Sequence, residues 1–246
     1  MYDPKGNSRE RTITSVAFEE AEPPAHLADI VHRYLDLRTD QPLVQDYQFH
    51  ALPDACTYLI FDQLDVRVTG VTQLRASFEE LNLGRTFHFV NIRFLPGVWQ
   101  RDLAAVEHGL VNRPYTGPLA LVDVNRSLIG TGFSDQQRIL SALVEDLHED
   151  GLVEPNPVTK RIFERMDDIH SVADMADVAG LSARQLQRVL KRTTGLAPHD
   201  FLKVLRLQQS LAGEPSLSYA DQSHFIHAFK KATGYTPGTF ARKFDV

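Results

Sequence analysis

The sequence predicts an α+β protein in which a small antiparallel β-barrel precedes an all-α domain. Three observations lead to this prediction. Short β-branched and aromatic runs follow one another between about residues 46 and 95, helical periodicity is strong at Asp135–His148, and the pattern beyond Pro157 is almost entirely helical. A length of 246 residues allows one large or two ordinary domains, each able to bury a core.

The predicted strands are short and are separated by residues that favour turns. The clearest runs are Thr57–Phe61, Val66–Val71 and Phe87–Phe94, and the last alternates between two faces. Turn residues such as Pro53-Asp54 and Asn82–Gly84 lie between the runs. Several short strands in series favour a small antiparallel barrel or sandwich.

Helices are expected on both sides of these strands. Ala25–Arg38 and Trp99–Leu110 have helical periodicity, and Asp135–His148 has a strong apolar stripe, with Ser134 as its expected N-cap and Gly151 as its stop. Leu152–Pro157 reads as a linker, because two prolines within three residues block both a helix and a central strand. The expected organisation is a polar lead-in at 1–24, a first domain at 25–151, a linker at 152–157 and a second domain at 158–246.

Charge is distributed unevenly along the chain, whose net charge is −6. Residues 158–246 carry 13 lysines and arginines against 9 aspartates and glutamates, whereas residues 1–157 carry 13 against 23. A basic C-terminal part suits phosphate binding, although chance variation of surface charge is an equally simple explanation. No run of eighteen apolar residues and no apolar signal segment is present, and the single cysteine, Cys56, excludes an internal disulfide framework. These features together indicate a cytoplasmic protein, with Cys56 as a small core residue.

The segment Ser171–Lys191 has the residue pattern of a helix-turn-helix. An apolar face is followed by Gly180, which can adopt the left-handed conformation of a tight turn, and by Ser182 as the cap of a second helix. The outward positions of that helix carry Arg, Gln and Lys, the side chains that reach base edges and phosphates. Any helical hairpin with a solvent-exposed face would show similar residues. The positions of Gly180 and Ser182 are therefore what favours a helix-turn-helix.

These motifs resemble the DNA-binding domain of the AraC/XylS family of transcription regulators. Ala179-Gly-Leu-Ser182, Leu186–Lys191 and Gly195-Leu-Ala-Pro198 resemble the family's first helix-turn-helix, and Tyr219–Pro237 resembles its signature. The resemblance covers about Pro157–Phe244. It implies a bi-lobed, all-α domain that places two recognition helices in successive major-groove segments about one helical turn apart.

The family's DNA contacts map onto both segments. By resemblance, the base-reading positions are Arg184, Gln187 and Arg188 in the first segment and Gln222, Ser223 and His227 in the second, with Ile226 available to a thymine methyl. The phosphate candidates are Lys191, Arg192, Lys230 and Lys231.

The chain departs from the family pattern between Arg206 and Tyr219. Roughly a dozen residues, about a three-turn helix, are absent there, so the second helix-turn-helix is expected to lack its first helix. His227 also stands where an arginine is common, and histidine is mostly neutral at pH 7. The first reading segment is therefore expected to dominate DNA binding.

The N-terminal part, about Pro23–Trp99, resembles less specifically the small cupin-like β-barrel sensor that precedes the DNA-binding domain in one branch of this family. A barrel mouth lined by aromatic residues could accept a small apolar or amphipathic effector, although each aromatic could equally fill the core. The candidate ligand-binding residues are His50, Tyr58, Phe61, Phe89, Phe94 and Trp99. His50 and His88 also invite a metal interpretation, but neither stands in a spaced set of ligands, so no metal or other cofactor is expected.

Catalytic patterns are missing from the sequence. Gly130-Thr-Gly132 has too few glycines for a dinucleotide loop, and no nucleophile elbow or activated cysteine is visible. The sequence thus favours a non-enzymatic, cytoplasmic regulator that binds double-stranded DNA and a small molecule, and forms a homodimer, as the resemblance implies. The alternative is an interaction protein whose shortened C-terminal domain pairs with another regulator rather than binding DNA alone.

Overall fold

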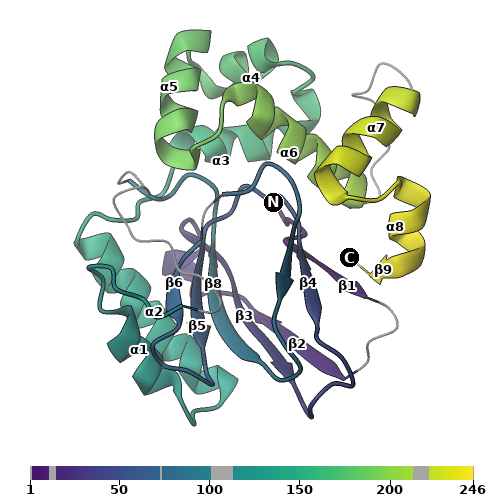
Figure 1. Ribbon diagram of the computed structural model, residues 1–246. Helices are drawn as coiled ribbons and strands as arrows, with labels where there is room; N and C mark the ends of the chain where they lie inside the picture. Colours follow the sequence, from purple (N-terminus) through teal and green to yellow (C-terminus); the bar gives the residue numbers. More distant parts are fainter. Residues whose placement is uncertain (1, 11–14, 73, 101–112, 213–221, 246) are drawn as a thin grey trace.

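The computed structural model describes residues 2–10, 15–72, 74–100, 113–212 and 222–245. Among the described residues, two antiparallel sheets and two helices form the part here called the β domain, and one short C-terminal strand completes the first sheet. The remaining helices lie over one end and along one side of this domain (Figure 1). The α+β class predicted from the sequence is confirmed. Within the described ranges, every helix is too short or too polar to cross a membrane.

The strands form two open sheets instead of the closed barrel that the sequence suggested. The first sheet has the order β7-β4-β1-β9 and the second the order β2-β3-β8-β5-β6, and all described pairs are antiparallel. The bounds are β1 (Asn7–Glu10), β2 (Val16–Ala21), β3 (Val31–Thr39), β4 (Gln48–Ala51), β5 (Tyr58–Asp62), β6 (Thr69–Val71), β7 (Glu79–Asn82), β8 (His88–Phe94) and β9 (Phe244–Asp245). Leu37, Phe87 and Phe89 of the second sheet pack with Tyr47 and Phe49 of the first.

The prediction of a helix at Ala25–Arg38 is wrong. Only a single 3-10 turn, η1 (Ala25–Leu27), precedes β3, which lies between β2 and β8. Tyr34 packs on the helix-covered face of the sheet while Leu35 and Leu37 point to the other face. Because both faces of this central strand are buried, apolar residues occur at consecutive positions and mimic helical spacing.

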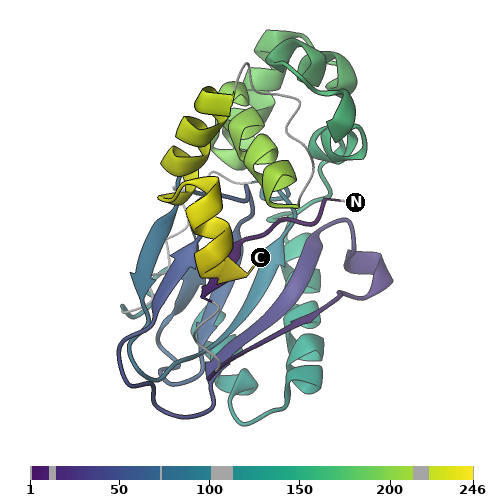
Figure 2. The same ribbon diagram turned by 90° about the vertical axis from the view of Figure 1, so that its right-hand side faces the viewer.

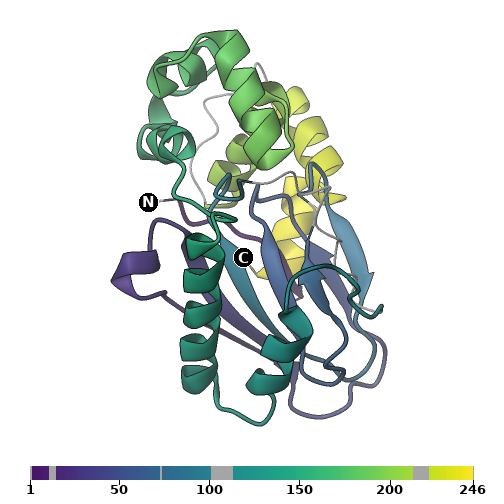
Figure 3. The ribbon, with the colours of Figure 1, turned by 90° about the vertical axis from the view of Figure 1, so that its left-hand side faces the viewer.

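Two helices cover the outer face of the five-stranded sheet (Figure 3). They are α1 (Leu121–Leu128) and α2 (Phe133–Glu149). The apolar stripe of α2, including Leu140 and Val144, is buried against the sheet, and the Tyr34 hydroxyl lies 2.8 Å from Ser141 Oγ. The stripe is therefore used inside the chain and is not free for a partner subunit.

The ends of the predicted helices are partly confirmed. Gly151 follows α2 with φ of 65°, as the expected stop, but Gly132 rather than Ser134 precedes the first turn of α2. Of the helix expected at Trp99–Leu110, residues 101–110 lie outside the described residues, and Trp99 pairs with Val153 in an extended bridge. The linker thus returns along the β domain before the next helix begins.

The C-terminal helices form two groups. The first lobe consists of α3 (Pro157–Glu164), the 3-10 turn η3 (Met166–Asp168), α4 (Val172–Ala179), α5 (Ala183–Thr194) and α6 (Pro198–Leu211), and the second consists of α7 (Gln222–Thr233), α8 (Pro237–Lys243) and β9. The first lobe packs around Met175, Leu186, Leu190 and Phe201. The second packs around Phe229 and Phe240 and lies beside the β1–β4 edge (Figure 2).

Candidate nucleic-acid interface

The helix-turn-helix predicted at Ser171–Lys191 is present as α4, a turn and α5. Ser171 Oγ accepts a hydrogen bond from Asp174 N at 3.1 Å and caps α4. Gly180 ends α4 in the left-handed conformation, with φ of 67° and ψ of 33°, and the Leu181 N–H returns to the Ala176 carbonyl at 2.9 Å. This closes the last turn of α4 with the hydrogen bonds typical of a glycine C-cap.

Ser182 then starts α5 with a complete capping box. Its hydroxyl accepts from Gln185 N at 3.3 Å, and its N–H donates to Gln185 Oε1 at 2.9 Å. Two amide groups that a helix start leaves without partners are thus satisfied by two side chains. The cap that was predicted from the sequence is confirmed, together with its reciprocal partner.

One face of α5 is buried and the other is exposed. Leu186 and Leu190 are fully buried against α4 and α6, whereas the candidate base-reading and phosphate residues are all exposed. Those exposed residues are Arg184, Gln187, Arg188, Lys191 and Arg192. None of these cations forms an ion pair with another described residue, so their charges are available to a ligand. In Figure 1, α4 and α5 lie at the opposite end of the molecule from α1 and α2.

The second reading segment is a helix as well. Ser223, Ile226 and His227 of α7 are exposed, as are Lys230 and Lys231, while the side chain of Gln222 lies outside what the structure describes. Phe229 is buried and meets Phe240 of α8 edge to face at 5.5 Å. The first lobe ends at α6. The expectation that the second helix-turn-helix lacks its first helix concerns residues 213–221, which lie outside the described residues.

The six residues predicted to bind an effector do not converge on one place. Phe61, Phe94 and Trp99 belong to the core under α1 and α2, and Phe89 lies between the two sheets. Tyr58 packs against the first lobe and donates its hydroxyl to Asp54, and His50 packs against the second lobe. The sheets are buried on both faces, so these six side chains lie in different parts of the core. The sequence had grouped them only because most of them are aromatic.

One buried polar atom without a hydrogen-bond partner among the described residues lies on the face of the five-stranded sheet that is turned toward the first sheet. Asn91 shares its sheet face with Leu35 and Ile60, opposite the face covered by α1 and α2. Its Oδ1 atom is buried and has no hydrogen-bond partner among the described residues. An unpartnered buried carbonyl oxygen is costly, which makes Asn91 a candidate contact that the sequence analysis missed.

Two buried side chains, Arg93 and His32, form a polar network next to this position with Glu20 and Asp3 at the surface. Arg93 Nε donates to His32 Nδ1 at 2.9 Å, Arg93 Nη2 lies 3.2 Å from Glu20, and His32 Nε2 lies 3.3 Å from Asp3. Burial and the adjacent Arg93 guanidinium lower the pKa of His32 to about 3, so this imidazole is neutral and can accept the hydrogen bond from Arg93.

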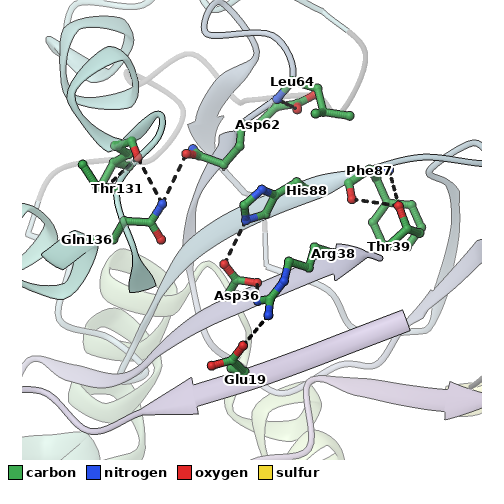
Figure 4. A network of polar contacts seen from close by, with 12 residues as sticks. Glu19, Asp36, Arg38, Thr39, Asp62, Leu64, Phe87, His88, Thr131 and Gln136 are labelled. Carbon is green, nitrogen blue, oxygen red and sulfur yellow. Dashed lines mark hydrogen bonds and ion pairs between the residues drawn. The ribbon is translucent and has the colours of Figure 1, made fainter. Parts of the chain in front are cut away.

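His88 has a protein partner in place of the metal weighed from the sequence (Figure 4). Its Nε2 atom lies 2.9 Å from Asp36, and Arg38 bridges Asp36 and Glu19. Burial would raise the pKa of Asp36, but hydrogen bonds from His88 and Arg38 lower it below its ordinary value. Within the described residues, no group of three or more His, Cys, Asp or Glu side chains is placed to hold a metal ion.

Asn156 and Gln208, which the sequence analysis did not single out, join the first lobe to the β domain. Asn156 caps α3 by accepting from Val158 N at 3.0 Å and also donates to the Gly97 carbonyl at 2.8 Å. Gln208 of α6 donates to the Pro53 carbonyl at 2.8 Å. Cys56 is buried in the same contact region, as a core residue. A single polar residue in a linker does not indicate, from the sequence alone, that its side chain connects two domains.

Comparison with protein families gives one match to the N-terminal part. Residues 19–110 match the family model described as Domain of unknown function (DUF6597). Among solved structures, ToxT from Vibrio cholerae has a TM-score of 0.41 and 10% sequence identity over 93% of this chain and 98% of that one. A ToxT structure with bound unsaturated fatty acid has a TM-score of 0.40 and 11% identity over 99% of this chain and 98% of that one.

Two curated relatives are helix-turn-helix regulators. The HTH-type transcriptional regulator MtrA of Neisseria gonorrhoeae is 25% identical over 148 residues, which cover 53% of this chain and 48% of the relative. The uncharacterized HTH-type transcriptional regulator YidL of Escherichia coli is 34% identical over 86 residues, 30% of this chain and 29% of the relative. This chain therefore spans less than half the length of either relative. The similarity confirms the resemblance to helix-turn-helix transcription regulators that the C-terminal motifs indicated.

Proposed function

We propose that this protein is a sequence-specific DNA-binding transcription regulator of the cytoplasm. One observation carries the proposal: the Arg184, Gln187 and Arg188 edge of α5 is exposed on a capped helix-turn-helix. Arginine reads guanine and glutamine reads adenine in the major groove, which is wide enough to admit a helix. Lys191 and Arg192, exposed near the end of the same helix, suit the flanking phosphates.

Charge supports the same function. The rest of the chain is acidic and repels DNA, whereas the exposed face of α5 is basic and attracts it. The protein is therefore expected to approach a duplex with this face of α5 first. Because phosphate contacts release counterions, affinity is expected to fall about tenfold per phosphate contact for each tenfold rise in salt concentration.

A selection experiment tests the proposal. Duplexes enriched from a random pool by the purified full chain are expected to be retarded in a gel shift at about 50 mM salt. Replacing both Arg184 and Arg188 by Glu should abolish retardation. The matched control replaces Arg126 and Arg138 by Glu, which changes the net charge equally on exposed positions of α1 and α2. No enrichment with a folded protein, or equal loss in the control, would overturn the proposal and favour the interaction-protein alternative.

The effector of the regulator is proposed to be a small amphipathic molecule held between the two sheets. Asn91 Oδ1 would accept a hydrogen bond from it, and Leu35 and Ile60 on the same sheet face would contact its apolar part. Occupancy would act by favouring one arrangement of the β domain over another. A compound from a library of such amphipathic molecules should raise the melting temperature of the wild type but not that of Asn91→Leu.

The resemblance also implies a homodimer. Sedimentation of the purified protein in the same buffer measures its molecular mass and tests this.

A further inference from the structure

The second reading helix, α7, rests on the β domain. Its last turn ends at Thr233, and the Ala232 carbonyl in that turn accepts a hydrogen bond from Phe78 N at 2.8 Å. Phe78 belongs to the chain just before β7, so a backbone amide of the β domain satisfies a carbonyl that a helix end leaves open. The Phe78 ring also lies so close to Gly234 that a Cβ there would be 2.8 Å from Phe78 Cζ.

His50 of β4 forms a second contact between the same parts. The imidazole is 2% exposed and lies between two rings, with centroids 5.1 Å from Phe78 and 5.0 Å from Phe244. Tyr235, two residues after the end of α7, meets it edge to face at 5.6 Å. Burial lowers the pKa of His50, so a neutral ring occupies the stack. Aromatic stacking of this kind fixes orientation as well as distance.

The chain end adds a third contact. β9 pairs antiparallel with β1, with Glu10 opposite Phe244 and Arg9 opposite Asp245. Leu52, next to β4, packs with Phe229 of α7 and Leu207 of α6, so the β domain and both lobes meet in this core. In Figure 2, α7 and α8 lie in front of this edge of the first sheet.

The face of α7 turned away from these contacts carries the exposed Ser223, Ile226 and His227. By contrast, α5 is held by α4, the partner helix of its own helix-turn-helix, through Met175 and Leu186. The two reading helices therefore have supports of different origin.

On the basis of the DNA-binding function proposed above, we propose that the β domain supports α7 through the contacts of Phe78 and His50 and thereby positions this helix for DNA. Phe78 and His50 act as positioning residues that set the direction of α7 on DNA. Changes in the first sheet would then reach α7 directly, without passing through α5.

The test uses the full chain and the duplex enriched by the wild type as probe. Phe78→Ala is expected to remove base protection from the half of the footprint contacted by α7, to leave the α5 half protected, and to weaken binding about tenfold. Phe49→Ala is the matched control, because Phe49 precedes His50 on β4 but packs between the sheets.

A double-mutant cycle separates positioning from general loss of stability. Phe78→Ala combined with His227→Ala should cost no more than Phe78→Ala alone, whereas Phe78→Ala combined with Arg188→Ala should be additive. A Phe78→Ala variant that keeps the full footprint and affinity overturns the inference and leaves the proposed function intact. If Phe78→Ala and Phe49→Ala both lose protection equally in the two halves of the footprint, the inference is overturned as well. A wild type that binds no duplex overturns both proposals.

Discussion

Arg188 and His227 occupy corresponding reading positions by resemblance, and their separate replacement by alanine measures how the two helices share DNA binding. Arg188 is exposed on α5 and forms no ion pair with another described residue, so Arg188→Ala should change the free energy of unfolding by less than about 0.5 kcal/mol. A bidentate contact to guanine is worth roughly 1–3 kcal/mol of discrimination, which corresponds to a loss of about 5-fold to 150-fold in affinity.

His227 should matter less. It is exposed on α7, and an imidazole cannot make the bidentate contact of an arginine, so one hydrogen bond of about 1 kcal/mol is expected, or roughly fivefold in affinity. Fluorescence anisotropy with the enriched duplex at a fixed salt concentration near 100 mM gives both dissociation constants, and urea unfolding checks that each variant is folded. Arg138→Ala, an exposed arginine on α2, is the control. Equal losses from Arg188→Ala and His227→Ala would refute the idea that α5 dominates.

Two further predictions concern the β domain and its joint with the first lobe. Asn156→Ala removes the cap of α3 and leaves the buried Gly97 carbonyl without its donor, so urea unfolding should show a loss of about 2–3 kcal/mol; a loss under about 0.5 kcal/mol would contradict the role of this joint. The pKa of His32 is about 3 in the folded protein, below the value near 6.5 expected when unfolded, so its contribution to stability is complete above pH 6.5 and is lost as the pH falls toward 3. His32→Gln retains an acceptor for Arg93 and should flatten this acid loss by about 1–2 kcal/mol between pH 7 and pH 5, and an unchanged pH profile would count against it.

Local signals in the sequence determined the first lobe. Gly180 and Ser182 act only on the backbone next to them in the sequence. Gly180 permits a left-handed turn, and Ser182 caps the helix that follows. The exposed and buried sides of α5 follow from a 3.6-residue period, so Arg188 and Leu190 could be placed on opposite faces without coordinates. The same reasoning failed for β3, where burial on both faces removed the alternation that identifies a strand.

Only the tertiary structure decided which distant segments meet. His50 was a candidate ligand contact in the sequence, but it lies in a stack with Phe78 and Phe244, residues separated from it by turns and by most of the chain. Pairing of β1 with β9 and the support of α7 by Phe78 N depend on how the two sheets and the helices pack. A local pattern fixes which face of an element is apolar, but not which apolar face elsewhere will cover it, because that choice is made by the packing of the whole chain.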